Sequence, residues 1–202
     1  MQQETPYYYH KLSELVNRDG YWPNLSDMQV EALKELDALL LSHPKIELNY
    51  PDLEHRKLRL LRFLRARDFN VKAACDMIKA DTSWRNSPDM MSFSKLSPKQ
   101  VLGLEDLSEF FVYFPTWIQG FDRQNRPVAY RKFGNFRISK VLELTKMENL
   151  IKFHGWESEQ VIRYMNWRSK EYMCNIETFL TIVDAEGVYL FSSSLCYILM
   201  LT

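Results

Sequence analysis

One continuous run, LLRFLRARDFNVKAACDMIKADTSWRNS at residues 60–87, constrains the fold more than any other part of the chain. Its beginning continues a stripe of leucines at helical spacing, which predicts a basic amphipathic helix ending near Arg67. Asn70 follows almost at once and is a suitable N-cap, because its side chain can accept a hydrogen bond from a free backbone N–H. A second helix is therefore predicted from Asn70, with Ala74 and Ile78 on its apolar side.

Capping signals predict two more helices in the first half of the chain. Ser26 and Gln29 form a capping box ahead of the apolar pattern VEALKELDALL, and His43–Pro44 ends that helix. Pro51–Asp52 opens the leucine-striped helix, whose stripe begins at Leu53. Ser97 followed by Pro98 predicts a fourth helix that runs toward Phe110.

The period of the apolar pattern changes in the second half. FFVYFPTWI and PVAYRKF are rich in strand-forming residues and flank the turn sequence GFDRQNR, which predicts two strands. Thr145 and Glu148 suggest a capping box for a long helix to about Cys174, with Gly155 as a weak point. FLTIVDA predicts a third strand that ends at Glu186–Gly187, and the serines at 192–194 suggest one more helix.

Strands that alternate with long helices predict an α/β fold with a mainly parallel or mixed sheet. We expect a lead-in at residues 1–23, a helical domain at 24–110, and an incomplete sheet packed by helices at 111–202.

Charge and motifs exclude several classes of function. The 26 basic and 26 acidic residues balance, which argues against a general nucleic-acid binder. The sequence has no glycine-rich phosphate loop and no hydrolase or metalloprotease motif, so no enzyme, cofactor or metal site is predicted. Its four histidines are widely separated, and Asp184 is read as a turn residue. The three cysteines have no CxxC spacing, and the first residues lack a signal-peptide core, so a cytoplasmic protein is expected.

The apolar run at residues 188–201 is broken by serines and is shorter than the ~20 residues of a spanning helix. A tail anchor is the lesser alternative for this run.

Taken in order, LRFLRAR–DFNV, GFDRQNRPVAY and FLTIVDAEGV resemble the CRAL-TRIO lipid-transfer family, the group of the yeast phosphatidylinositol-transfer proteins. The resemblance extends from about Gly20 to the end of the chain. It implies a small helical domain followed by a sheet with helices on one face and a lipid pocket on the other. The sequence stops partway through the family's lipid-binding domain. A fragment, a wrongly assembled gene product and a truncated paralogue are all compatible with this, and we expect this chain alone to transfer lipid poorly or not at all.

Arg67 is the first candidate contact for a lipid headgroup. In a continued helix it would fall on the side of the leucines, where a guanidinium needs a partner and suits a phosphate. Alternatively, it lies beyond the helix end and binds the last carbonyls. The resemblance implies the phosphate role, because the matching arginine in phosphoinositide binders contacts the inositol-linked phosphate. Arg59 and Arg62 are expected on the solvated side.

The predicted strand at residues 179–184 supplies the second candidate, Thr181, whose hydroxyl could bind a headgroup on an otherwise apolar face. Phe179, Val183 and Tyr130 are expected to line the pocket. The resemblance implies a hydroxyl pair at the positions of Phe179 and Thr181, so half of that pair is replaced here. The tyrosines of the family's choline site match Ile118 and Ala129, which cannot form an aromatic cage.

The sequence thus predicts a module that binds and transfers a hydrophobic ligand, either a phospholipid or another hydrophobic small molecule. The alternatives are a truncated, non-transferring interaction or regulatory module and, far behind, an enzyme. We expect a monomer that contacts membranes transiently as a peripheral protein and does not bind nucleic acid.

Overall fold

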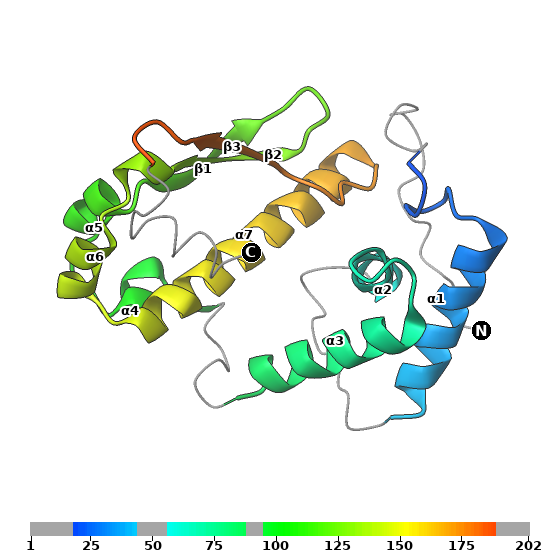
Figure 1. Cartoon of the computed structure of the whole chain (residues 1–202). Coiled ribbons are helices and arrows are strands. Elements are labelled where there is room, and N and C mark those ends of the chain that lie inside the picture. Colours follow the sequence, from blue (N-terminus) through cyan, green and yellow to red (C-terminus); the bar gives the residue numbers. More distant parts are fainter. Residues whose placement is uncertain (1–17, 44–55, 88–94, 189–202) are drawn as a thin grey trace. The chain divides into compact units, whose positions relative to one another are not determined.

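The computed structural model describes residues 18–43, 56–87 and 95–188. They form two compact units (Figure 1). The first contains residues up to Met91 together with Ser169–Glu177, and the second contains Ser92–Arg168 and the residues from Thr178 onward. In this division the helix that begins at Pro98 packs with the second unit.

In its described residues up to 87, the first unit contains the helices α1 (Asp27–Leu41), α2 (Arg56–Arg65) and α3 (Val71–Arg85). Each of them buries its apolar stripe, as the helical spacing predicts. Their shared core consists of Leu33, Leu36, Leu40, Leu60, Leu61, Phe63, Leu64, Ala74, Cys75 and Ile78. The predicted start of the leucine-striped helix at residues 51–53 lies outside the described residues.

Helix ends in this unit follow the predicted capping chemistry. The Ser26 hydroxyl accepts from the Gln29 backbone N–H, and the Gln29 side chain accepts from the Ser26 N–H, which confirms the capping box. The Asn70 side chain accepts a 2.9 Å hydrogen bond from the Ala73 N–H at the start of α3. Between α2 and α3 the backbone passes through positive φ at Asp68 and Phe69, and the Phe69 N–H donates to the Leu64 carbonyl.

The second unit begins with two short helices instead of the single predicted one. These are α4 (Pro98–Leu102) and α5 (Ser108–Tyr113). The Ser97 cap is confirmed, but α4 ends at Gly103, whose positive φ of 68° forms a left-handed C-cap. The segment FFVY, predicted as strand, forms most of α5, where Phe110 is fully buried. Local strand preference is overridden there by packing of aromatic rings against Phe114 and Phe153.

A three-stranded sheet follows, in the order β1 (Thr116–Phe121), β2 (Pro127–Lys132) and β3 (Leu180–Asp184). β1 and β2 are antiparallel, whereas β2 and β3 are parallel. The parallel pair requires a crossover, which η2 (Phe133–Asn135), α6 (Ile138–Leu144) and α7 (Met147–Tyr172) provide. The predicted mixed α/β sheet is confirmed.

The long helix α7 runs without interruption through Gly155, so the suspected weak point does not break it. Thr145 does not form the predicted box with Glu148. It is the C-cap residue of α6, and its hydroxyl donates to the Leu102 carbonyl and accepts from the Asn149 side chain. A buried polar bond to α4 is thus made in place of a local cap. Of the helices described, none has both the length and the apolar character needed to cross a membrane.

Candidate functional site

The register of the sheet assigns its side chains to two surfaces. Cα partners align Ile118 with Ala129 and Ala129 with Thr181, and neighbouring partners point to the same side. One surface, here called the α7-facing surface, therefore carries Thr116, Ile118, Ala129, Arg131, Thr181 and Val183. The opposite surface carries Trp117, Tyr130, Leu180 and Ile182.

The residues expected to line a pocket do not share one of these surfaces. Thr181 and Val183 lie on the α7-facing surface, which is the helix-covered side and not the side where the resemblance places a lipid pocket. Phe179 comes two residues before Thr181 and lies just outside β3. Tyr130 lies on the opposite surface, where its ring stacks on Trp117 at 5.4 Å between centroids and 8° between planes. Tyr130 therefore cannot line the same side of the sheet as Thr181 and Val183.

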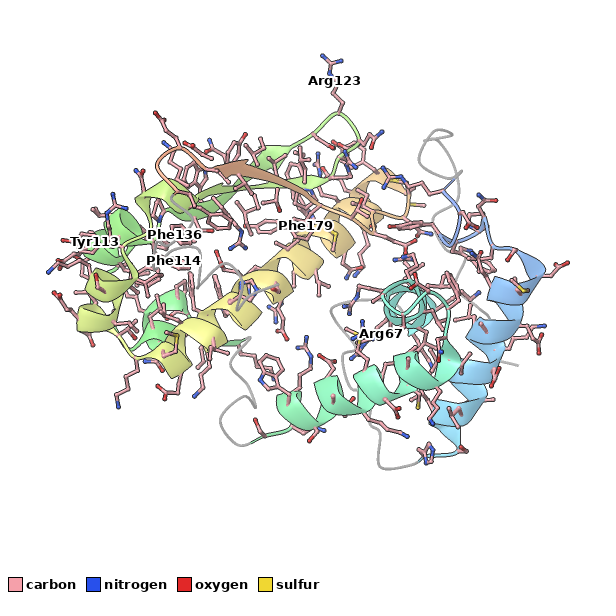
Figure 2. The ribbon with its side chains drawn as sticks, in the orientation of Figure 1. Arg67, Tyr113, Phe114, Arg123, Phe136 and Phe179 are labelled. Atoms are coloured by element: carbon pink, nitrogen blue, oxygen red, sulfur yellow. The ribbon has the colours of Figure 1, made fainter. Side chains whose placement is uncertain are left out.

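Both surfaces of β3 are open, because every residue of this strand is exposed. Phe179, labelled in Figure 2, directly precedes the strand and is 44% exposed, and Val183 within the strand is 47% exposed. Leu180 and Ile182 are exposed on the other side. Exposed apolar side chains gathered on one strand are typical of a surface that another apolar group covers.

Arg67 lies beyond the end of α2 and is exposed (Figure 2). Its guanidinium donates a 2.7 Å hydrogen bond to the Ala66 carbonyl. The expected inward orientation is therefore wrong within the first unit, because the helix stops at Arg65 and the wheel position no longer applies. The structure agrees with the alternative, in which Arg67 lies past the helix end and binds a carbonyl there.

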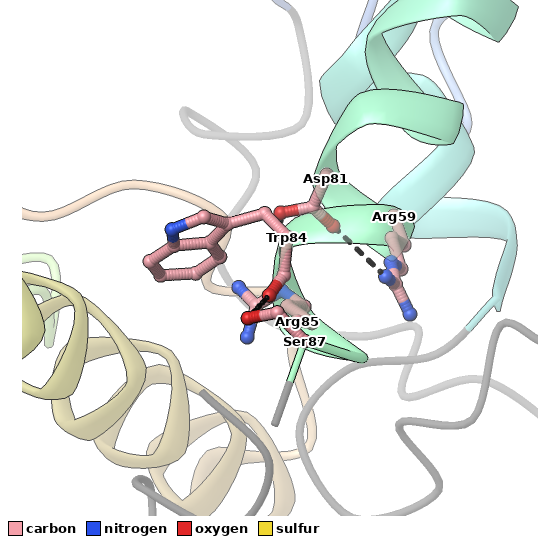
Figure 3. Close-up of polar contacts among 5 residues, drawn as sticks. All are labelled: Arg59, Asp81, Trp84, Arg85 and Ser87. Atoms are coloured by element: carbon pink, nitrogen blue, oxygen red, sulfur yellow. Dashed lines mark hydrogen bonds and ion pairs between the residues drawn. The ribbon is translucent and has the colours of Figure 1, made fainter. Parts of the chain in front are cut away.

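The expected solvation of Arg59 and Arg62 is also wrong. Arg59 is only 4% exposed, and its Nη2 lies 3.5 Å from Asp81 Oδ2 on α3 (Figure 3). Arg85 binds the other carboxylate oxygen of Asp81 at 3.0 Å. Arg62 is half-buried, with its guanidinium over the Phe63 ring. Arg59 is thus buried against α3 together with the leucines of α2.

A buried polar cluster lies between the α7-facing surface and α7. The Thr116 hydroxyl donates a 3.0 Å hydrogen bond to Glu157 Oε1. Arg131, the cross-strand partner of Thr116, places Nη2 3.7 Å from Glu157 Oε2. The two strands thus converge on one carboxylate of α7, which is 7% exposed.

Burial determines how this cluster titrates. Burial raises the pKa of Glu157, although Arg131 and the Thr116 hydroxyl act in the opposite direction. Burial and the neighbouring Arg131 charge lower the pKa of His154, one helical turn before Glu157. The cluster therefore favours a neutral imidazole beside the Arg131 cation. The described residues contain no group of three or more side chains suited to hold a metal ion.

Comparison with protein families finds one match in each half of the chain. The family described as "CRAL/TRIO, N-terminal domain" matches residues 31–80, and "CRAL/TRIO domain" matches residues 112–198. Together the two matches cover most of the chain. The chain belongs to the CRAL-TRIO family. Both the predicted family and the predicted partial CRAL-TRIO fold are confirmed.

Curated CRAL-TRIO relatives include lipid-transfer proteins. The chain is 30% identical over 179 residues to "SEC14 cytosolic factor" of Yarrowia lipolytica, covering 88% of this chain and 34% of that protein. It is 28% identical to the protein of the same name from Kluyveromyces lactis, covering 85% of this chain and 54% of that protein. "Phosphatidylinositol/phosphatidylcholine transfer protein SFH13" of Arabidopsis thaliana is 26% identical over 64% of this chain and 20% of that protein. The chain spans between a fifth and about half of these relatives' lengths.

Sequence reasoning missed the Thr116–Arg131–Glu157 cluster of this CRAL-TRIO chain. A signal for it exists, because Leu150, Phe153, Glu157 and Val161 follow one helical stripe and all are buried. A carboxylate within an apolar stripe requires a partner. The partner, Arg131, could not be identified from spacing alone, because it depends on how α7 returns across the sheet.

Proposed function

We propose that this chain is a module that binds a hydrophobic ligand, a phospholipid, and carries it between membranes. The observation that carries the proposal is the open β3 strand, with exposed apolar side chains next to the hydroxyl of Thr181. The CRAL-TRIO match includes this strand. Transfer of phosphatidylinositol and phosphatidylcholine, printed in the name of the Arabidopsis relative, supports the choice of ligand class.

In this proposal the ligand's acyl chains cover Phe179 and Val183, which removes apolar surface from water. Thr181 hydrogen-bonds the headgroup from the same surface. Arg67 remains the second proposed headgroup contact, because its exposed guanidinium can exchange the Ala66 carbonyl for a phosphate. The protein acts by binding and release, with no catalytic step, as a monomer that touches the membrane only transiently and remains in the cytoplasm.

The alternative is an interaction or regulatory module of the same family that does not transfer lipid. The first unit favours it as a working surface, because its three helices have a complete core of their own. Under this alternative, the open surfaces of β3 serve a purpose other than enclosing lipid.

Lipid loading and vesicle transfer distinguish the two. The purified chain is mixed with vesicles of phosphatidylcholine, phosphatidylethanolamine and phosphatidylinositol, re-isolated, and its bound lipid is quantified by mass spectrometry. We expect close to one phospholipid per chain, with slow movement of a fluorescent phospholipid to acceptor vesicles, in line with the poor transfer expected of this chain alone. Bound phospholipid in close to stoichiometric amount supports the proposal, whereas the absence of loading contradicts it and supports the alternative.

A further inference from the structure

Arg131 is a largely buried cation whose hydrogen-bonding capacity is mostly unused. Its side chain is 15% exposed, and its ion pair with Glu157 spans 3.7 Å. Charge-assisted hydrogen bonds are shorter, at about 2.7–2.9 Å, and a guanidinium offers five donors in a planar fork. Within the described ranges, no side-chain hydrogen bond of Arg131 accompanies this ion pair. Its donors can therefore accommodate another acceptor beside Glu157.

Glu157 offers the complementary group. Its Oε1 accepts the Thr116 hydroxyl, whereas its buried Oε2 accepts no hydrogen bond from the described part of the chain. The buried Nδ1 of His154, on the same helix, also forms no hydrogen bond with the described part of the chain. Buried polar atoms are almost always paired, and an unpaired carboxylate oxygen is costly. A hydrogen-bond donor placed within reach of Oε2 would remove this cost. An acceptor on the same group would use the free donors of Arg131.

The position of the pair connects it to the proposed ligand surface. Arg131 aligns with Val183 on β3, and its neighbour two residues back, Ala129, aligns with Thr181. Arg131, Val183 and Thr181 thus lie together on the α7-facing surface. Because Val183 is 47% exposed, this surface is open on the β3 side of Arg131.

We propose that Arg131 and Glu157 select the ligand's headgroup. Arg131 donates to a phosphodiester oxygen, and Glu157 Oε2 accepts from a hydroxyl or primary ammonium on the same headgroup. This inference rests on the proposed lipid binding and specifies its ligand: a phospholipid whose headgroup carries a hydrogen-bond donor. Ethanolamine and inositol lipids satisfy both groups. A quaternary ammonium has no N–H, so a choline lipid leaves Glu157 Oε2 unpaired.

A purely structural role is the competing explanation, in which the pair only ties α7 to the sheet. The two explanations differ in what substitution changes. Loss of a structural tie lowers the melting temperature and leaves the ratio of bound lipids unchanged. Loss of a headgroup contact changes that ratio, because discrimination depends on the difference between two binding affinities.

The test uses competition among lipids. Wild type is loaded from vesicles with equal parts of phosphatidylcholine, phosphatidylethanolamine, phosphatidylinositol and uncharged diacylglycerol, and bound lipids are quantified by mass spectrometry. We expect at least ~10-fold retention of the two donor-bearing phospholipids over the choline lipid, since one charged hydrogen bond separates them. Glu157→Gln should bring this ratio to within about threefold of one, because an amide also accepts but without a charge.

Arg131→Met should lower phospholipid loading ~10-fold relative to diacylglycerol, because the phosphate loses its charged donor. The double variant Arg131→Met/Glu157→Gln guards against unfolding, since it leaves no buried charge alone. Arg123→Met is the matched control, because Arg123 is exposed and projects from the tip of the β1–β2 hairpin (Figure 2). It should leave all ratios unchanged.

The outcomes distinguish failure of the proposed function from failure of the headgroup inference. Wild type that loads no lipid overturns the proposed function and this inference with it. Wild type that loads phospholipid, with ratios the same in the folded double variant, overturns the inference and keeps the proposed function. Preferred retention of phosphatidylcholine by wild type also overturns it.

Discussion

Thr116 on β1 and Glu157 on α7 are joined by a buried hydrogen bond of 3.0 Å from the threonine hydroxyl to the carboxylate. With Arg131 on the neighbouring strand, this bond attaches the crossover helix to the sheet. Burial raises the pKa of Glu157, so it disfavours the ionised form of the carboxyl group that makes this attachment.

Stability should therefore depend on pH through Glu157. The folded state holds this proton more tightly than the unfolded chain, where the carboxyl titrates near its ordinary value of 4.5. The resulting stabilisation is complete below that value and is lost as pH rises through the raised folded pKa. Glu157→Gln cannot ionise, so its unfolding free energy should improve relative to wild type as pH rises from about 4.5. Urea unfolding of both proteins across pH measures this, and a difference independent of pH would contradict it.

The stability of the β1–β2 hairpin should depend on the ionisation of Asp122, with a pH dependence opposite to that of Glu157. Burial alone would raise the pKa of Asp122, but hydrogen bonds from Arg126 and the Gln124 backbone N–H outweigh it and lower the pKa. Asp122→Ala should destabilise by about 1–2 kcal/mol at neutral pH, through loss of charged hydrogen bonds. Because the folded pKa is below the ordinary 3.8, this difference should shrink as pH falls below 3.8. A constant difference between pH 7 and pH 2 would show that the carboxylate charge is not involved.

Gly134 in η2 is required by a close backbone approach. A Cβ at this position would collide with the carbonyl oxygen and carbon of Glu186, just after β3. Backbone atoms cannot rotate away as a side chain can, so Gly134→Ala should cost roughly 1–3 kcal/mol and loosen the β3 end. Hydrogen exchange should be faster in β3 than in β1 of the variant. Equal exchange in the two strands would indicate that the turn absorbs the methyl group.

The Asn70 cap provides a matched test in the first unit. Asn70→Ala removes the 2.9 Å hydrogen bond to the Ala73 N–H and should cost about 1 kcal/mol. Asn86→Ala, at the other end of α3, is the control, because the bonds that end the helix there come from the Asn86 backbone N–H. The two melting temperatures should separate, with Asn70→Ala the lower, and equal values would mean that the cap contributes little.

Helix ends were predictable because they depend on neighbouring residues. Contacts between distant elements have no signal in the hydrophobic pattern of the sequence. The caps at Ser26, Asn70 and Ser97 require only neighbouring residues, so their sequence signals suffice. A helical wheel identifies the leucine side of α2 and therefore predicts that Arg59 is solvated. It contains no information on α3, whose Asp81 pairs with Arg59 in the structure. Glu157 was missed for the same reason.

The candidate site was predictable only in part. Strict alternation correctly places Thr181 and Val183 on one side of β3, in line with their partners Ala129 and Arg131. Which of those sides α7 approaches depends on the crossover, which has no local signal. The β2–β3 register likewise has no local signal, and it alone puts Tyr130 on the surface opposite Thr181 and Val183.

Phe179 gives a final test of headgroup recognition. It lies two residues before Thr181, at the position where the family resemblance implies a second hydroxyl. Phe179→Ser should strengthen binding of inositol lipid by about 0.5–1.5 kcal/mol if the new hydroxyl makes one net hydrogen bond. Leu180→Ser is the matched control, because Leu180 is 37% exposed and points to the opposite surface. Mass spectrometry of lipids bound from mixed vesicles should show an inositol-lipid gain for Phe179→Ser alone. An equal gain in both variants would assign the effect to lost apolar bulk, and no gain in either would remove the headgroup role from this end of β3.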